Sequence, residues 1–287
     1  MTTTISDSHR TDPADQALKQ RHRAMWALGN YPAVADEIVG PLGPVLVDAL
    51  RIEPGQHVLD VATGSGSAAI PAALNGGRVT ATDLTPELLE VGRRHAAQRD
   101  ADLRWQVADA EALPFQNDTF DTAMSCIGVM FAPHHQAGAD ELVRVTRAGG
   151  RIGLVNWTPE GFIGQMFAIM KPYAPTPPPG VQPPPLWGSP DHLDALFGDR
   201  VTDVRVERRT LTVTRFSAAE DFKDFFKANY GPTIVTYRNI ADDPQRVADL
   251  DRALDDLARR HLDAGDGGAM EWEYLLYTAT KSPGSTN

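Results

Sequence analysis

The strongest constraint on the fold is an alternation between residues 57 and 157, in which short apolar runs are followed by amphipathic stretches of helical spacing. Each apolar run has the length of a strand, and the runs lie at 57–61, 78–82, 103–107, 120–126 and 151–157. Predicted helices lie between most of them, at 67–74, 86–98 and 136–146. Strands joined by helices pair in parallel through right-handed crossovers, with helices on both faces of the sheet. The sequence therefore predicts an α/β fold with a doubly wound, mostly parallel sheet.

Two predicted helices precede the sheet, and a region of different character follows it. The helices span 15–28 and 33–50, and the second is interrupted at Gly40-Pro41 and Gly43-Pro44. Nine prolines fall within residues 172–190, which excludes a helix or an inner strand there. Because this segment leaves the carboxyl edge of the sheet, where open parallel sheets bind ligands, it is either a lid or a plain linker. The remaining predicted elements are strand structure at 201–214, helices at 218–229 and 244–262, and a final strand at 271–280.

A single domain over residues 13–280 accounts for this pattern. Its core is expected at about 50–157, and its covering region combines an inserted lid at about 158–200 with the helical segments 13–50 and 217–262. The two ends, residues 1–12 and 281–287, are polar and are predicted to be disordered tails.

The charge of the chain argues against nucleic acid as a partner. The 38 acidic residues outnumber the 27 basic ones, the formal net charge is −11, and no basic patch interrupts this excess. A single cysteine, Cys126, excludes an intrachain disulfide and a multi-cysteine metal site. We expect no metal site of another kind either. No apolar stretch reaches the ~20 residues of a membrane helix, and the polar start lacks the apolar centre of a signal peptide. The expected location is the cytoplasm, without membrane insertion.

A glycine-rich turn follows the first predicted strand and opens the next helix, in the stretch that starts at Asp60. Gly64 and Gly66 allow a ligand to approach the backbone, and the helix amino terminus favours a negative group. Asp83 stands nineteen residues after Gly64 at the end of the second strand, where a carboxylate can accept both hydroxyls of a ribose. The same residues, with Ala69, also satisfy the dinucleotide fingerprint. The glycines alone therefore leave the choice of nucleotide cofactor open.

Two further residues distinguish between these cofactors. A carboxylate at Asp60 would crowd a pyrophosphate but can receive the amino group of a methionyl moiety. A second carboxylate, Asp109, follows the third predicted strand. With these features the chain resembles the class I S-adenosylmethionine-dependent methyltransferases over residues 25–157, and especially their ubiquinone and menaquinone C-methyltransferase-like branch. The resemblance implies that S-adenosylmethionine is the cofactor and that the fold is Rossmann-like.

The resemblance also implies a role for each matched position. The methionine part would be held by Asp60, Ala62, Gly64 and Gly66, with Ala62 in place of a glycine. The adenosine part would be held by Asp83 at the ribose, Asp109 at the adenine amino group, Leu84 packed on the adenine and the backbone of Ala110. Cys126, in the apolar run of the fourth strand, completes the set and is expected to be buried rather than reactive. A turn at Gly149-Gly150 would lead into the fifth strand.

Methyl transfer is an in-line displacement at an already activated sulfonium carbon, so the protein mainly aligns the reactants in a dry pocket. If the acceptor has to lose a proton, His134, with His135 beside it, follows the fourth strand near the expected methyl group and is the candidate base. The competing interpretation is an exposed residue that starts the following helix. Tyr31 is a second catalytic candidate, because the family often places a tyrosine of the N-terminal lid near the cofactor carboxylate.

Aromatic and thioether side chains outside the sheet are the expected walls of the acceptor pocket, and they favour a small, planar, fairly apolar molecule. These residues are Trp26, Tyr31, Trp157, Phe162, Met166, Trp187 and Tyr230. The sequence leaves open whether the methyl group goes to oxygen, carbon or nitrogen, and whether the chain forms a homodimer. Two other functions also stay open at this point: an NAD(P)-dependent oxidoreductase, and a non-catalytic S-adenosylmethionine-binding regulator of a partner.

Overall fold

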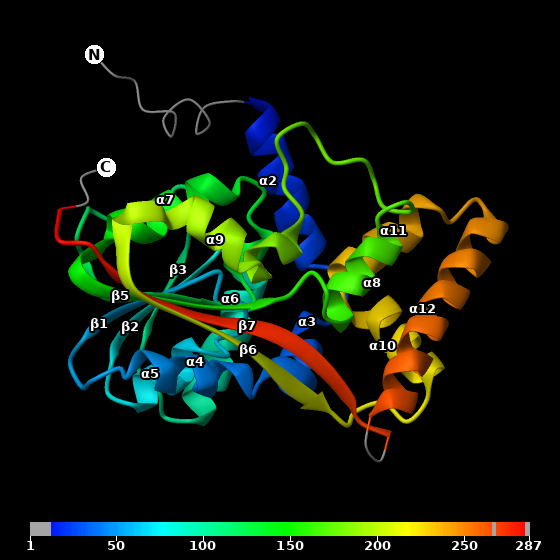
Figure 1. Cartoon of the computed structure of the whole chain (residues 1–287), viewed down its shortest axis with the longest axis horizontal. Helices are drawn as coiled ribbons and strands as arrows, with labels where there is room; N and C mark the ends of the chain where they lie inside the picture. Colours follow the sequence, from blue (N-terminus) through cyan, green and yellow to red (C-terminus); the bar gives the residue numbers. More distant parts are fainter. Residues whose placement is uncertain (1–12, 266–267, 285–287) are drawn as a thin grey trace.

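The computed structural model describes residues 13–265 and 268–284, which form a seven-stranded sheet with helices packed around it (Figure 1). The strands are β1 (His57–Val61), β2 (Arg78–Asp83), β3 (Arg104–Val107), β4 (Phe120–Cys126), β5 (Thr146–Trp157), β6 (Val201–Val213) and β7 (Met270–Lys281). Their order in the sheet is β3-β2-β1-β4-β5-β7-β6. Strands β1 to β5 pair in parallel, whereas β7 runs antiparallel between β5 and β6. The predicted doubly wound, mostly parallel α/β fold is confirmed.

Helices cover both faces of the sheet and gather at one end of it (Figure 1). In this view α4 (Leu42–Leu50) and α5 (Ala69–Leu74) lie below the sheet, and α7 (His135–Val145) and α9 (Pro190–Phe197) lie above it. A further helix, α6 (Pro86–Gln98), joins β2 to β3. The helical cap, at the right, consists of α8 (Phe162–Met170), α10 (Ala219–Asn229), α11 (Gly231–Asn239) and α12 (Pro244–Ala264). Among the described residues no helix combines the length and the apolar character needed to cross a membrane.

The N-terminal region reaches the sheet in several short helical pieces. It comprises α2 (Pro13–Trp26), α3 (Tyr31–Val34) and the π-helical turn η1 (Ala35–Val39), which precede α4. Gly40 and Pro41 separate η1 from α4, as the sequence predicts, although both keep helical φ and ψ angles. The second predicted interruption is wrong, because Gly43-Pro44 lies inside α4. Gly43 lies in the first turn of α4, and a Cβ added there would be 1.7 Å from the backbone oxygen of Ser67. Helix α4 therefore touches the turn that follows β1, with no room for a side chain between them.

The start of β5 differs from the prediction. The strand already begins at Thr146, so the turn expected at Gly149-Gly150 lies inside the strand. Gly149 has a φ of +73°, and the β4–β5 register shifts between Phe120 and Thr122 opposite this stretch. Residues 147–150 thus stand opposite the single residue Asp121, so the chain makes an irregular excursion inside the strand rather than a turn that precedes it.

The predicted tail at 281–287 begins too early, because Lys281 is the last residue of β7. Its buried Nζ donates to Oδ1 of Asp118 at 2.7 Å and to the backbone oxygen of Thr146 at 2.8 Å. The tail predicted at 1–12, and the last part of the C-terminal one, 285–287, lie outside the described residues.

The proline-rich segment arches away from the body of the molecule between α8 and the 3-10 turn η3 (Pro184–Gly188), which leads into α9 (Figure 1). Both of its ends are held. Nη2 of Arg246 in α12 donates to the backbone oxygen of Pro172 at 2.8 Å. The backbone N–H of Gln182 donates to the backbone oxygen of Pro133 at 3.1 Å. The segment therefore ties the helical cap to the loop that follows β4.

Candidate functional site

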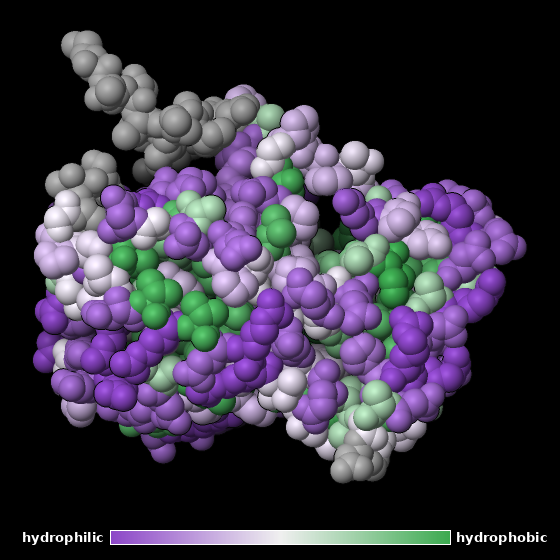
Figure 2. Space-filling view, viewed as in Figure 1, coloured by the Kyte–Doolittle hydropathy of each residue, from purple (hydrophilic) through white to green (hydrophobic). Residues whose placement is uncertain are grey.

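A pocket lies where the carboxyl ends of β1 to β4 meet the N-terminal helices. Its volume is about 830 Å³, counted with its open mouth. The residues that line it are Lys19, His22, Trp26, Tyr31, Val39, Ala62, Thr63, Gly64, Ser67, Asp83, Leu84, Leu88, Ala108, Asp109, Ala110, Cys126, Ile127, Gly128, Phe131, Ala132 and Pro133. The space-filling view shows a deep opening between α2 and the helical cap, beneath the proline-rich segment (Figure 2).

Most of the residues singled out in the sequence meet at this pocket. Those that line it are Tyr31, Ala62, Gly64, Asp83, Leu84, Asp109, Ala110 and Cys126. Asp60 and Gly66 lie behind this lining, in the strand and turn that carry it. His134 is not among the lining residues. The structure thus brings the strand-end residues together and leaves the predicted base outside their group.

Asp83 organises the glycine-rich turn through both of its carboxylate oxygens. The backbone N–H of Gly64 donates to Oδ2 and that of Thr85 donates to Oδ1, each at 2.8 Å. Burial raises the pKa of Asp83, and these two N–H groups oppose that shift. Each oxygen keeps a second lone pair, so the carboxylate can still accept two hydrogen bonds from the pocket.

The turn itself requires left-handed backbone at alternate positions. The φ angles are +53° at Ala62, +58° at Gly64 and +92° at Gly66. A Cβ at Gly66 would lie 2.8 Å from the indole of Trp105, so this position needs glycine for space as well as for conformation. At Ala62 the side chain is accommodated at a conformational cost of roughly 1–2 kcal/mol.

Asp60 presents one unsatisfied oxygen. Its side chain is buried, Oδ2 accepts from the Thr63 hydroxyl at 2.6 Å, and Oδ1 has no hydrogen-bond partner among the described residues. Burial raises the pKa of Asp60 to about 7, although the bond from Thr63 opposes the shift. A buried carboxylate with a free oxygen is suited to receive a cationic or donor group.

At the opposite end of the pocket, the ammonium group of Lys19 joins two acidic residues. Its Nζ lies 2.9 and 2.7 Å from Oδ1 and Oδ2 of Asp109, and 2.5 Å from Oε2 of Glu111. Burial acts to lower the pKa of Lys19, but the carboxylates of Glu111 and Asp109 together raise it above its usual value. The lysine therefore remains charged, and it holds α2 to the loop after β3.

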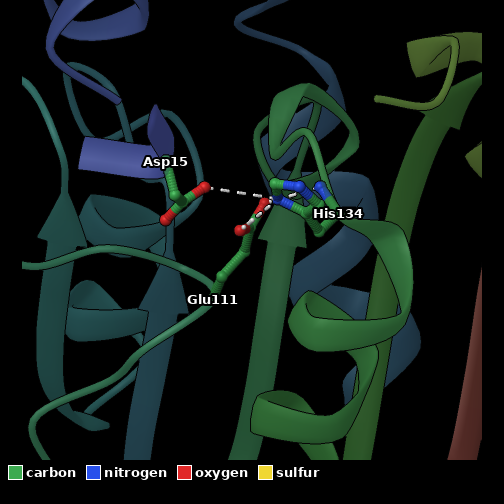
Figure 3. A group of neighbouring side chains, drawn as sticks. All are labelled: Asp15, Glu111 and His134. Carbon is green, nitrogen blue, oxygen red and sulfur yellow. Dashed lines mark hydrogen bonds and ion pairs between the residues drawn. The ribbon is translucent and has the colours of Figure 1, made fainter. Parts of the chain in front are cut away.

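His134 takes part in the same network (Figure 3). Its Nδ1 lies 3.0 Å from Oε2 of Glu111 and 3.6 Å from Oδ1 of Asp15, and its backbone N–H donates to Oε1 of Glu111 at 2.7 Å. These three side chains are of the kinds that bind metals, and their ligand atoms lie within 4.8 Å of one another. However, Oε2 of Glu111 already accepts a hydrogen bond from Lys19. The ammonium group of Lys19 therefore occupies the side of Glu111 on which a metal cation would bind.

Two other histidines lie nearby, with different surroundings. His22 lines the pocket, and its pKa is lowered by burial and by the charge of Lys19, while a hydrogen bond to the backbone of Phe131 opposes the shift. His135 is fully buried, with Nδ1 2.9 Å from Nε2 of His192, and burial lowers its pKa to about 3. His22 is thus a neutral imidazole inside the pocket, and it is not among the site residues that the sequence predicts.

Aromatic rings close the pocket at the end of α2. Ring centroids lie 5.2 Å apart for Trp26 and Tyr31, 4.7 Å for Trp26 and Phe131, and 5.8 Å for Trp26 and Tyr230, all edge to face. Burial raises the pKa of the Tyr31 hydroxyl, with smaller contributions from Cys126 and Asp83, so the phenol stays protonated. This end of the pocket presents ring edges and faces rather than charges.

Comparisons with known proteins agree with this geometry. An uncharacterized protein of Mycobacterium tuberculosis strain H37Rv is 52% identical over 267 residues, which cover 93% of this chain and 96% of the relative. The methyltransferase-domain family matches residues 58–150. The ubiquinone/menaquinone biosynthesis C-methyltransferase of Zymomonas mobilis is 39% identical over 106 residues, 37% of this chain and 44% of that protein. The chain therefore carries a methyltransferase domain at residues 58–150 and belongs to one family with the mycobacterial protein.

The methyltransferase also shares its fold with solved structures of low sequence identity. The YcgJ protein of Bacillus subtilis superposes with a TM-score of 0.57 at 17% identity, covering 84% of this chain and 98% of the other. Phosphoethanolamine N-methyltransferase 2 of Haemonchus contortus gives a TM-score of 0.53 at 16% identity, with coverages of 84% and 52%. The predicted Rossmann-like fold is therefore confirmed. The methyltransferase domain at 58–150 supports S-adenosylmethionine as the methyl donor.

Proposed function

We propose that the methyltransferase binds S-adenosylmethionine across the ends of β1 to β3 and transfers the methyl group to a small, apolar acceptor that contains a ring. The observation that carries this proposal is the placement of two strand-end carboxylates, Asp83 and Asp109, in the lining of one pocket, with the buried strand-end carboxylate of Asp60 behind that lining. Any one of them could serve only to cap a turn. Their joint placement matches the amino group, ribose and adenine of a single ligand.

The residues present fit this cofactor. The free oxygen of Asp60 can accept from an amino group, and the spare lone pairs of Asp83 can accept from two ribose hydroxyls. Gly64 offers backbone without a side chain. An adenine would lie between apolar walls at the end of β3, close to the carboxylate of Asp109. These walls are Leu84, Ala108 and Ala110.

Bound S-adenosylmethionine supplies a methyl group that its positive sulfur has already activated. The chain aligns the acceptor with this group and keeps water out, which is the task of Trp26, Tyr31 and Phe131 at the pocket end. The protonated Tyr31 hydroxyl can orient an acceptor as a hydrogen-bond donor. We retain His134 as a candidate base for an acceptor that must lose a proton; it would have to leave Glu111 to reach the pocket.

The same rings support the choice of acceptor. Trp26 contacts Tyr31, Phe131 and the buried Tyr230 edge to face. The rings of Trp26, Tyr31 and Phe131 line the pocket, and an aromatic or quinonoid ring packs on them at lower desolvation cost than a charged molecule. Phenols, quinones and heterocycles are therefore the acceptors to test, with a labelled methyl donor.

Isothermal titration tests the donor side directly. We expect one equivalent of S-adenosylhomocysteine to bind saturably and NAD not to bind, since the buried carboxylate of Asp60 disfavours a pyrophosphate at the turn. Binding of NAD alone would instead support an oxidoreductase and contradict the proposal. Binding of S-adenosylhomocysteine without transfer to any acceptor of the proposed class would favour a regulatory protein.

Proton release on binding is a second expected result. The pKa of Asp60 is about 7 in the folded protein and 3.8 in the unfolded chain. Asp60 therefore contributes its full stabilisation of the fold below pH 3.8, and this contribution is lost as the pH rises through 7. The ligand amino group, as a cation, favours the ionised carboxylate, so binding at pH 6 should release close to one proton from Asp60, and binding at pH 8 much less. Titrations in two buffers of different ionisation enthalpy measure this number. Unchanged proton release in Asp60→Asn would contradict the assignment.

A further inference from the structure

Lys19 controls how many hydrogen bonds Asp109 can still accept. Its Nζ donates to both oxygens of Asp109, and the backbone N–H of Glu111 donates to Oδ1 at 2.9 Å. A carboxylate oxygen accepts about two hydrogen bonds. Oδ1 is therefore filled, and Oδ2 retains one free position. The pocket offers a single, oriented acceptor at this point.

The position of Lys19 does not depend on Asp109 alone. The ammonium group is also bound to Glu111, whose other oxygen accepts from the backbone N–H of His134. The side chains of Lys19 and Glu111 are only 10% and 5% exposed, so water does not compete for these bonds. Lys19 is thus fixed from the side away from the pocket, and it fixes Asp109 in turn.

We propose that Lys19 is a positioning residue that makes the pocket selective for an amino group at the adenine position. The proposal rests on the proposed function, in which the adenine lies beside Asp109. With the carboxylate held by Lys19, its one free acceptor position is directed at a donor N–H. A ligand with a carbonyl oxygen at the same place would face that carboxylate and lose the hydrogen bond.

The test compares two probes, S-adenosylhomocysteine and S-inosylhomocysteine, in which a carbonyl oxygen replaces the adenine amino group. We expect the wild-type protein to prefer the adenosyl probe on the order of a hundredfold in isothermal titration. In Lys19→Met the carboxylate loses two donors and can turn away from a carbonyl. The adenosyl probe should then bind about tenfold more weakly, and the preference should fall to about tenfold or less.

Two further variants keep the test decisive. Lys19→Met leaves the buried charge of Glu111 without its ion pair to the lysine, and the single variant could fail to fold for that reason. The double variant Lys19→Met with Glu111→Gln removes this charge as well. It should show the same loss of preference for the adenosyl probe. Lys223→Met is the matched control, because Lys223 in α10 forms a 3.0 Å ion pair with Asp255 in α12, and its side chain is 13% exposed and does not line the pocket. It should leave both affinities unchanged.

The alternative outcomes separate the possibilities. If Lys19→Met weakens both probes by the same factor, the lysine only holds α2 in place and the proposal is wrong. If the variant binds S-adenosylhomocysteine more tightly, Lys19 competes with the ligand for Asp109, which also overturns it. If the wild-type protein binds neither probe, the proposed function itself fails, and this inference fails with it.

Discussion

Asp83→Asn is expected to lower the affinity for S-adenosylhomocysteine by about a hundredfold or more, because two hydrogen bonds to a charged acceptor are lost. The side chain keeps its size, but the amide has only one oxygen. Its NH₂ group must then face the backbone N–H of Gly64 or that of Thr85, which now donate to the two oxygens of the carboxylate. Both the ribose contact and the turn that carries Gly64 are affected. Isothermal titration measures the loss.

A matched control for this variant is Asp121→Asn. Asp121 also accepts a backbone N–H, from His57 at 2.6 Å, but at the amino end of β1 and away from the pocket. It should lower stability modestly and leave the affinity unchanged. Binding by Asp83→Asn within a few-fold of the wild-type protein would contradict the ribose role, and with it the cofactor arrangement proposed above.

Gly43→Ala should have the largest effect on stability. The added methyl group would lie 1.7 Å from the backbone oxygen of Ser67, which cannot rotate away as a side chain would. Helix α4 and the turn after β1 must separate to admit it. We expect the free energy of unfolding to fall by about 2–3 kcal/mol and S-adenosylhomocysteine to bind more weakly, because the displaced turn is the one that carries Gly64. Chemical denaturation and titration give the two values.

Gly138→Ala is the control for this substitution. Gly138 is also a helical glycine, in α7, but a Cβ there would meet Val129 at 3.4 Å, an ordinary contact. Alanine has the higher helix propensity, so this variant should be neutral or more stable by up to about 1 kcal/mol. Equal destabilisation of both variants would show that the close approach of α4 to the turn is not what matters.

The sequence predicts the sheet better than the cap. The bounds of β1, β4 and α6 agree with the prediction, because each is a compact run with clear ends, such as Pro86 at the start of α6. Three helices were not predicted: α8, α9 and α11. Helix α8 is apolar almost throughout, so no periodicity marks it, and α9 follows directly on the proline-rich segment. Their structure depends on packing against elements far away in the chain.

Some residues of the site can likewise be predicted from the sequence, and others cannot. Asp60, Gly64 and Asp83 are found from the sequence because the turn and the strand ends form a local pattern of fixed spacing. Lys19 is not, because its partners stand 90 and 92 residues further on. The spacing of Asp15, Lys19, His22 and Trp26 does place them on one face of a helix, but the sequence does not show what that face covers. The contact of His134 with Glu111 depends in the same way on how distant loops meet.

The position of β7 in the sheet has a consequence for folding during synthesis. Among the described residues this strand is the last in sequence, yet it lies between β5 and β6. Until residues 270–281 leave the ribosome, β6 has no partner in the sheet and β5 ends in an open edge, to which other chains can add. A premature stop before β7 would therefore yield a chain that carries Asp60, Asp83 and Asp109. In this chain β5 and β6 would both be unpaired on the side that β7 otherwise occupies, and so open to aggregation.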